Sequence, residues 1–139
     1  MTVAYFDTSA IVKLLVREEG SRIAREAWQA AVVLVAVTLL RVETRAALAA
    51  AHRHGRLTAV QLSDAKSELS HRLWPQLTVV HVDDDLVKHA GDLAEQESLR
   101  ADNAVHLAAA IAAGSDLVVT GDQQLLRAAA NQGLTSLAV

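Results

Sequence analysis

The sequence predicts a three-layer α/β/α sandwich around a central, mainly parallel sheet of four to five strands. Two observations carry this prediction. Short apolar runs rich in β-branched residues alternate along the chain with longer segments of helical periodicity, and no linker, repeat or low-complexity tract interrupts the alternation. A chain of 139 residues is long enough to bury a sizeable core. We therefore expect one domain spanning residues 1–139.

In the first half of the chain, apolar runs are followed by helical segments that begin at polar residues. The N-terminal run stops at Asp7, where Thr8 or Ser9 is suited to cap the next helix. A β-branched run comes later, and Thr38 is a candidate N-cap for the long helix behind it. A glycine and a Trp-Pro pair then end two helices. These signals predict strands at 3–6 and 32–37, and helices at 10–16, 22–30, 39–53 and 58–73.

The second half repeats this alternation. A third apolar run precedes Asp83, Asp84 and Asp85, which suit a helix N-terminus because the helix dipole favours negative charge there. The helix after that one is apolar nearly all round, which is typical of a buried element, and it ends at Gly114. The second half is predicted to contain strands at 77–82 and 117–119, an edge strand at 134–137, and helices at 83–97, 101–113 and 122–131.

Composition narrows the class of protein. The chain has no cysteine, which excludes disulfides and thiolate metal sites and fits a reducing cytoplasm. It shows no signal segment and no apolar run of membrane-spanning length, so we expect a cytoplasmic protein without a membrane partner. The formal net charge of −3 gives no general attraction to nucleic acid, and any such binding requires a local basic patch.

Two acids occupy the same place relative to two strands. Asp7 and Asp122 each follow an apolar run and precede a helix. Either one alone is ordinary N-capping. Because the carboxyl ends of parallel strands meet at one edge of a sheet, the pair is expected to lie close together. Glu43 lies one turn into the helix after the second strand and starts from the same edge.

Glu43 is an unusual residue for its helix face, which it shares with apolar residues (Leu39, Ala46, Ala47 and Ala50). A carboxylate on such a face needs a cation, a metal or hydrogen bonds to offset the cost of its burial. One interpretation is a marginal glutamate paired with Arg41 or Arg45. The other is a ligand to a divalent cation shared with the strand-end acids, because clustered carboxylates repel one another without one. Oxygen ligands without cysteine favour Mg²⁺ or Mn²⁺ over zinc.

Four motifs resemble the PIN-domain family, specifically the VapC toxins of bacterial toxin–antitoxin pairs. They are YFDTSA at 5–10, VETRAAL at 42–48, LRADNAVHLA at 99–108 and VTGD at 119–122. The resemblance covers essentially the whole chain. It implies a PIN-like sandwich in which four acids bind Mg²⁺ or Mn²⁺ and cleave RNA, a homodimer, and a cognate VapB-like antitoxin that fills the active-site groove.

The resemblance assigns site residues one by one. Asp7, Glu43 and Asp122 correspond to the first, second and fourth acids, as catalytic residues and metal ligands. Thr8 and Thr120 would orient them by hydrogen bonding. Arg100 and His106 flank the third position and could contact phosphate or orient their neighbour, although a buried structural role explains the histidine equally well.

The third acid is where the chain departs from the family, which has an aspartate at the position of Asn103. Asp102 points about 100° away around the helix and is a poor substitute. An asparagine oxygen can touch a metal but carries no charge and cannot act as a base. We expect weaker metal binding and greatly reduced cleavage. A deliberate inactivating change and natural divergence both fit the sequence.

Several other functions differ in how well they fit the sequence. A haloacid-dehalogenase-type phosphatase needs a second acid where this chain has Ser9, and a receiver domain needs a late lysine, whereas the last one here is Lys88. A non-enzymatic module that binds RNA or its antitoxin stays open because of Asn103. Nuclease activity on DNA structures rests on fold analogy alone. A basic run (His52, Arg53, His54 and Arg56, with Arg41 and Arg45 on the same helix) could guide RNA or could be a solvated helix end.

Overall fold

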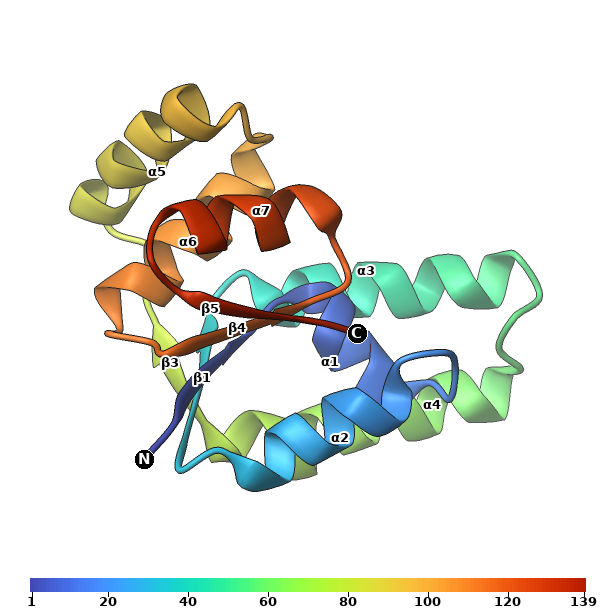
Figure 1. Cartoon of the computed structure of the whole chain (residues 1–139). Coiled ribbons are helices and arrows are strands. Elements are labelled where there is room, and N and C mark those ends of the chain that lie inside the picture. The colour runs from blue at the N-terminus through green and yellow to red at the C-terminus, as the bar shows by residue number, and fades with distance from the viewer.

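The computed structural model describes residues 1–139, and its centre is a five-stranded sheet with the order β3-β2-β1-β4-β5 (Figure 1). All neighbouring strands are parallel. This confirms the three-layer α/β/α prediction, with the predicted edge strand present as β5. The strands are β1 (Val3–Phe6), β2 (Val33–Val37), β3 (Leu77–Val80), β4 (Leu117–Thr120) and β5 (Thr135–Ala138).

Seven α-helices connect the strands, and each lies within two residues of a prediction at its start. They are α1 (Thr8–Leu15), α2 (Ser21–Ala30), α3 (Leu40–Arg53), α4 (Ala59–Glu68), α5 (Asp84–Glu97), α6 (Ala101–Ala112) and α7 (Gln123–Asn131). The predicted helix at 58–73 ends differently: after α4 the chain continues in a π-helical turn, Leu69–Leu73, and a 3-10 turn that contains Pro75. No helix is long and apolar enough to cross a membrane.

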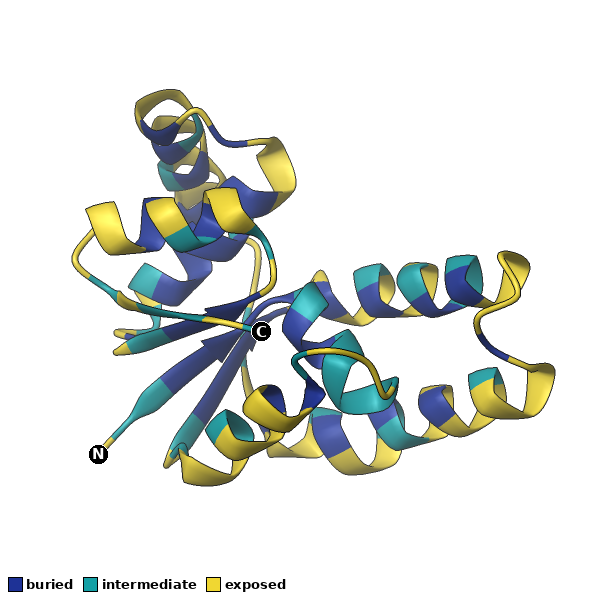
Figure 2. Cartoon of the chain, turned by 45° about the vertical axis from the view of Figure 1, so that its right-hand side comes forward, coloured by how far each residue is buried: buried dark blue, intermediate teal, exposed yellow.

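Alternating side chains of the strands pack into two separate cores, one on each face of the sheet. The strands of the sheet's centre are buried between the helical layers (Figure 2). Tyr5 and Val118 pack with α5, α6 and α7 on one face. Phe6 and Val119 pack with α1, α2 and the π-helical turn on the other. The helix α6 is buried along most of its length, as its composition predicts. Residues one apart on a strand thus face different layers, which is the period-2 geometry of strands.

The helices α3 and α4 extend beyond the carboxyl edge of the sheet and share a small core of their own (Figure 1). The buried face of α3 consists of Leu40, Thr44, Leu48 and Ala51. The sequence prediction of an apolar face through Leu39, Ala46, Ala47 and Ala50 is therefore wrong by about one residue around the helix. Glu43 lies at the margin of the buried face and is half-buried.

Two predicted N-caps are also wrong. The side chain of Asp7, not of Thr8 or Ser9, caps α1 by accepting a hydrogen bond from the Ala10 N–H at 3.0 Å. Thr38 does not cap α3, because its hydroxyl donates to the Val80 carbonyl at 2.9 Å and so extends the pairing of β2 with β3. The acidic start of α5 is as predicted, with a side-chain cap at its first acid.

Candidate functional site

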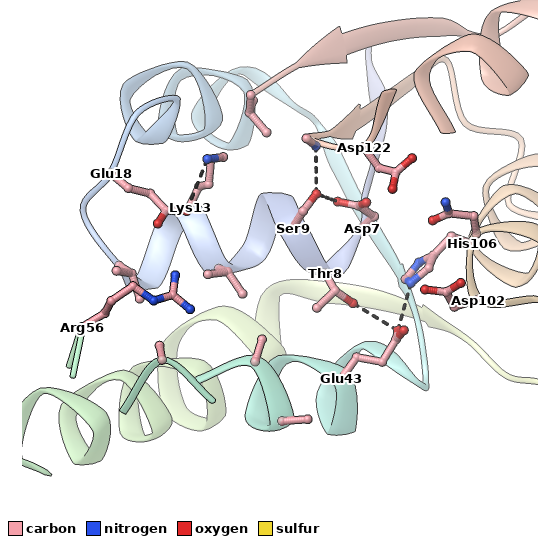
Figure 3. A pocket seen from close by; sticks show the side chains of 18 of the residues that line it. Asp7, Thr8, Ser9, Lys13, Glu18, Glu43, Arg56, Asp102, His106 and Asp122 are labelled. Atoms are coloured by element: carbon pink, nitrogen blue, oxygen red, sulfur yellow. Dashed lines mark hydrogen bonds and ion pairs between the residues drawn. The ribbon is translucent and has the colours of Figure 1, made fainter. Parts of the chain in front are cut away.

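The carboxyl edge of the sheet opens into a cleft of about 840 Å³ between α1, α3 and α6 (Figure 3). The strand order places β1 between β2 and β4, so the segments that follow these three strands all reach this edge. The predicted site residues that line the cleft are Asp7, Thr8, Glu43, Arg100, Asn103, His106 and Asp122. Thr120 does not line the cleft, but its hydroxyl donates a hydrogen bond to Asp7.

Asp7 is the deepest acid of the cleft, with 4% of its surface exposed. Its Oδ1 accepts hydrogen bonds from the Ser9 hydroxyl at 2.7 Å and from the Ala10 N–H at 3.0 Å, and its Oδ2 accepts one from the Thr120 hydroxyl at 2.5 Å. Burial raises the pKa of Asp7, and these donors together with His106 only partly oppose the rise. The carboxylate is rigidly held in surroundings that disfavour its charge.

Two hydroxyls join the β1–α1 junction to the β4–α7 junction. The Ser9 hydroxyl donates to Asp7 and accepts from the Gly121 N–H at 2.8 Å. The Thr120 hydroxyl donates to Asp7 and accepts from the Asp122 N–H at 3.0 Å. Thr120 therefore supports the acids as predicted. The sequence does not predict this bridging role of Ser9, although its position two residues after Asp7 is a signal for it.

Asp122 caps α7 and faces the cleft. Its Oδ1 accepts hydrogen bonds from the Gln124 N–H at 2.9 Å and the Leu125 N–H at 3.1 Å, which leaves Oδ2 without a hydrogen bond. Partial burial raises the pKa of Asp122, but the N–H groups of these two residues, the Asn103 amide and the charge of Arg100 outweigh it and lower the pKa overall. Asp122 therefore keeps its charge more readily than Asp7 does.

Glu43 reaches the cleft from α3, and its Oε1 accepts two hydrogen bonds. One comes from the Thr8 hydroxyl at 3.0 Å and the other from His106 Nε2 at 2.9 Å (Figure 3). The interpretation of Glu43 as paired with Arg41 or Arg45 is wrong, since no ion pair joins it to either. Thr8 thus has the predicted supporting contact. Glu43 Oε2 has no hydrogen bond.

Asn103 is buried in the first turn of α6, and its Nδ2 has no hydrogen-bond partner. Its amide lowers the pKa of Asp122, although no hydrogen bond of ordinary length joins the two side chains. Asp102 does not take its place, because its side chain is largely exposed and pairs with Arg100 at 3.2 Å. The third corner of the site is thus an uncharged amide beside Asp122.

The cleft offers oxygen donors of the kind that Mg²⁺ and Mn²⁺ prefer. No group of three His, Cys, Asp or Glu side chains is arranged to hold a metal ion. Glu43 Oε2 and Asp122 Oδ2 are free of hydrogen bonds, and the orphaned Asn103 amide lies between elements that carry acids. The donors therefore fit a hard divalent cation in type, with Asn103 contributing a neutral amide.

Basic side chains lie at both ends of the cleft. Arg100 lies at the α6 end, and Arg17 and Arg56 lie at the far end without an ion pair. Lys13 is engaged by Glu18 at 3.2 Å. The basic run predicted from the sequence is divided by the fold. Of its members only Arg56 lines this cleft, whereas Arg41 and Arg45 line a second hollow between α3 and α4.

Comparison with known proteins identifies the family. A model described as the PIN domain matches residues 4–131. Two Mycobacterium tuberculosis proteins, Ribonuclease VapC45 and Ribonuclease VapC49, are each 39% identical over 127 residues, which is 90% of this chain and 88% of theirs.

Solved structures share the fold at low sequence identity. VapC20 of Mycobacterium tuberculosis, a Sarcin-Ricin loop cleaving toxin, matches with a TM-score of 0.70 at 17% identity, over 98% of this chain and 99% of its own. VapBC2 of Rickettsia felis, bound to a promoter DNA fragment, matches with a TM-score of 0.67 at 14% identity, over 98% of both chains. The family model, the two relatives and the fold agree, and the chain belongs to the PIN-domain family, in its VapC branch.

Proposed function

We propose that this chain is the endoribonuclease toxin of a VapBC-type toxin–antitoxin pair, which hydrolyses RNA phosphodiester bonds in a metal-dependent reaction and is weakened by Asn103. The observation that carries the proposal is the convergence of Asp7, Glu43 and Asp122 on one cleft from three separate parts of the chain. The 39% identity to two proteins named ribonucleases supports RNA as the substrate.

We assign Mg²⁺, or Mn²⁺, as the cofactor, held by Asp7, Glu43, Asp122 and the Asn103 side chain. When bound, such a cation activates water and stabilises the charge that develops on phosphate. The protein's own contribution is to fix the carboxylates. Ser9 and Thr120 hold Asp7, and Thr8 and His106 hold Glu43. At the mouth of the cleft, Arg100 would contact a phosphate of the RNA.

The proposed partners follow from the same relatives. A cognate VapB-like antitoxin and a second copy of this chain are the protein partners, and the cytoplasm is the compartment. The fold is shared with the VapBC2 structure and with a toxin–antitoxin complex from Klebsiella pneumoniae, which matches with a TM-score of 0.64 at 16% identity. An open cleft that accepts an RNA strand could equally accept an antitoxin segment, so the two would compete.

A second candidate function is a PIN module that binds RNA or its antitoxin without cutting. Asn103 favours it, because the side chain removes one of four charges that would neutralise a cation, and no group of three metal-binding side chains remains. RNA binding and RNA cleavage measured on the same preparation separate the two functions. Binding without any cleavage in Mg²⁺ or Mn²⁺ supports the second.

The deciding experiment is Asn103→Asp. Total RNA, tRNA and rRNA are incubated with the chain and with the variant, in Mg²⁺, in Mn²⁺ and in chelator. We expect the variant to cut at least about tenfold faster, within the range seen when a residue that supports a metal site is altered, and the chelator to abolish cutting. The matched control is Asp7→Asn added to Asn103→Asp, which should not cut. A variant that cuts no RNA with metal present would overturn the nuclease proposal.

A further inference from the structure

His106 uses both ring nitrogens in a buried chain of hydrogen bonds that links the two helical layers. It is 3% exposed on α6. Its Nδ1 lies 2.6 Å from the Tyr5 hydroxyl, and its Nε2 lies 2.9 Å from Glu43 Oε1. Tyr5 lies on β1 and packs on the α6 side of the sheet, whereas Glu43 comes from α3 beyond the sheet edge. The His106–Glu43 contact is the hydrogen bond that joins α3 to α6.

When His106 is neutral, its partners determine which nitrogen carries the proton; when it is protonated, both nitrogens are donors and Nε2 still donates to Glu43. An ionised Glu43 carboxylate can only accept, so Nε2 must donate to it. Nδ1 is then bare and must accept, and the Tyr5 hydroxyl is its donor. Tyr5 is fully buried, and its phenol O–H can donate to a bare imidazole nitrogen at this distance. The opposite tautomer would set the Nε2 lone pair against the carboxylate.

Glu43 therefore accepts all of its hydrogen bonds through one carboxylate oxygen. Thr8 and His106 both donate to Oε1, which leaves Oε2 as the single oxygen without a partner. We propose that His106, with its tautomer set by Tyr5, is a positioning residue that holds Glu43 so that only Oε2 is available to a ligand in the cleft. Fixing the other nitrogen of a histidine by a buried donor is a general way to orient the group that it contacts. The activity test of this inference rests on the proposed function, but its structural test does not.

The structural test uses the metal-free protein. The ¹⁵N shifts and long-range ¹H–¹⁵N couplings of the imidazole report the tautomer of each histidine directly. We expect His106 in the Nε2–H form, with a slowly exchanging Nε2 proton. In Tyr5→Phe, which removes only the hydroxyl, we expect that signal to shift and the proton to exchange faster. An Nδ1–H tautomer, or a spectrum that Tyr5→Phe leaves unchanged, would overturn the inference whatever the protein's activity.

The functional test compares replacements that keep or lose the donor. In an Asn103→Asp background, His106→Gln can still place an amide N–H near Glu43, whereas His106→Leu fills the space without a donor. We expect His106→Leu to lower kcat about 10- to 100-fold with little change in KM, and His106→Gln to recover most of the loss. His71→Leu, an exposed histidine outside the cleft, is the matched control.

A positioning role of His106 can be distinguished from a folding defect and from failure of the proposed function. Equal melting temperatures of the leucine and glutamine variants with unequal kcat support positioning, whereas equal kcat refutes it. If no protein in the series cuts RNA, the proposed function fails, and the tautomer measurement alone decides the role of His106. Mn²⁺ titration by calorimetry adds a further reading, in which the leucine variant should bind more weakly than the glutamine variant.

Discussion

At the scale of single residues, the site depends on carboxylates that hydrogen bonds from the protein hold in place through one oxygen or both. Glu43 and Asp122 each use one oxygen for two hydrogen bonds and leave the other free. Asp7 uses both. Anchoring one oxygen orients a carboxylate before a ligand arrives, which lowers the entropy that binding must remove. These hydrogen bonds lower the pKa of both Asp7 and Asp122, but burial outweighs them at Asp7 and not at Asp122.

The raised pKa of Asp7 leads to a pH prediction for stability. Between the unfolded pKa of an aspartate and the higher folded pKa of Asp7, the native state binds more protons than the unfolded state. The free energy of unfolding contributed by Asp7 therefore falls as pH rises through this window. Asp7→Asn cannot ionise and escapes this loss. We expect the melting temperature of Asp7→Asn, relative to that of the unaltered protein, to rise between pH 4 and pH 8 in chelator.

An exposed acid on α5 provides the control for this prediction. Asp92→Asn is the matched change, because it also replaces an aspartate by asparagine but at an exposed position outside the cleft. Asp122 acts in the opposite sense. Its lowered pKa gives stability that is present above the unfolded pKa and lost as pH falls through the folded one. A difference between Asp7→Asn and the unaltered protein that stays flat or shrinks with rising pH would contradict the burial argument.

At the scale of elements, the cleft runs between α1 and α3, with Asp7, Glu43 and Asp122 at one end and, at the other, Arg17 and Arg56 without an ion pair beside the Lys13–Glu18 pair (Figure 3). Small residues of α3 (Ala46, Ala47 and Ala51) line its floor, so no large side chain obstructs it. Arg17 follows α1, and Arg56 lies in the loop between α3 and α4. A single strand of RNA laid along the cleft would meet cations away from the acids, which overcomes the general repulsion of a chain with a net charge of −3.

We therefore predict that Arg17 and Arg56 contribute to RNA binding rather than to the chemical step. In an Asn103→Asp background, the double change Arg17→Glu and Arg56→Glu should raise KM about tenfold, leave kcat nearly unchanged and weaken the salt dependence of RNA binding. Filter binding at several salt concentrations measures the last effect. Arg25→Glu on α2, which lines a different hollow, is the control. If the double change and the control altered KM and the salt dependence of RNA binding equally, a specific contribution of Arg17 and Arg56 would be refuted.

At the scale of the whole molecule, the C-terminal strand closes the sheet against the turn between α1 and α2. The Val139 N–H donates to the Thr120 carbonyl at 3.1 Å. A Cβ at Gly20 would lie 2.5 Å from the Val139 carbonyl carbon, and Gly20 also has φ +90. Sequence positions more than a hundred residues apart are thus packed backbone to backbone beside the cleft. Only glycine meets both conditions without a shift of the backbone.

This contact predicts a difference between two glycine-to-alanine changes. Gly55 has φ +78 but nothing within 4 Å of a Cβ, so Gly55→Ala should cost only the backbone strain, about 1 kcal/mol. Gly20→Ala adds a collision with backbone atoms, and we expect about 2–4 kcal/mol in total. Urea unfolding curves give both values. Equal losses for the two variants would show that the packing of the C-terminal strand on Gly20 contributes nothing.

Much of the architecture was predictable because it depends on short-range interactions. Periodicity placed every strand and helix start within two residues, and acids before helices marked the caps at Asp83 and Asp122. The errors at Thr38 and on the buried face of α3 have one cause. In both cases contacts with a distant segment compete with local ones, and local spacing does not show which prevail. The Thr38 hydroxyl, for example, donates to the Val80 carbonyl, forty-two residues away, and not to the N-terminus of α3.

By itself the sequence determined the α/β alternation, the acids Asp7 and Asp122 at strand ends, and an uncharged side chain at Asn103, since each depends on residue type and local spacing. Only the tertiary structure decided that Glu43 binds His106 rather than a neighbouring arginine, that Ser9 bridges two junctions, and that the basic run is divided between two hollows. The physical reason is the strand order, which sets β1 between β2 and β4 and so selects which distant side chains can meet.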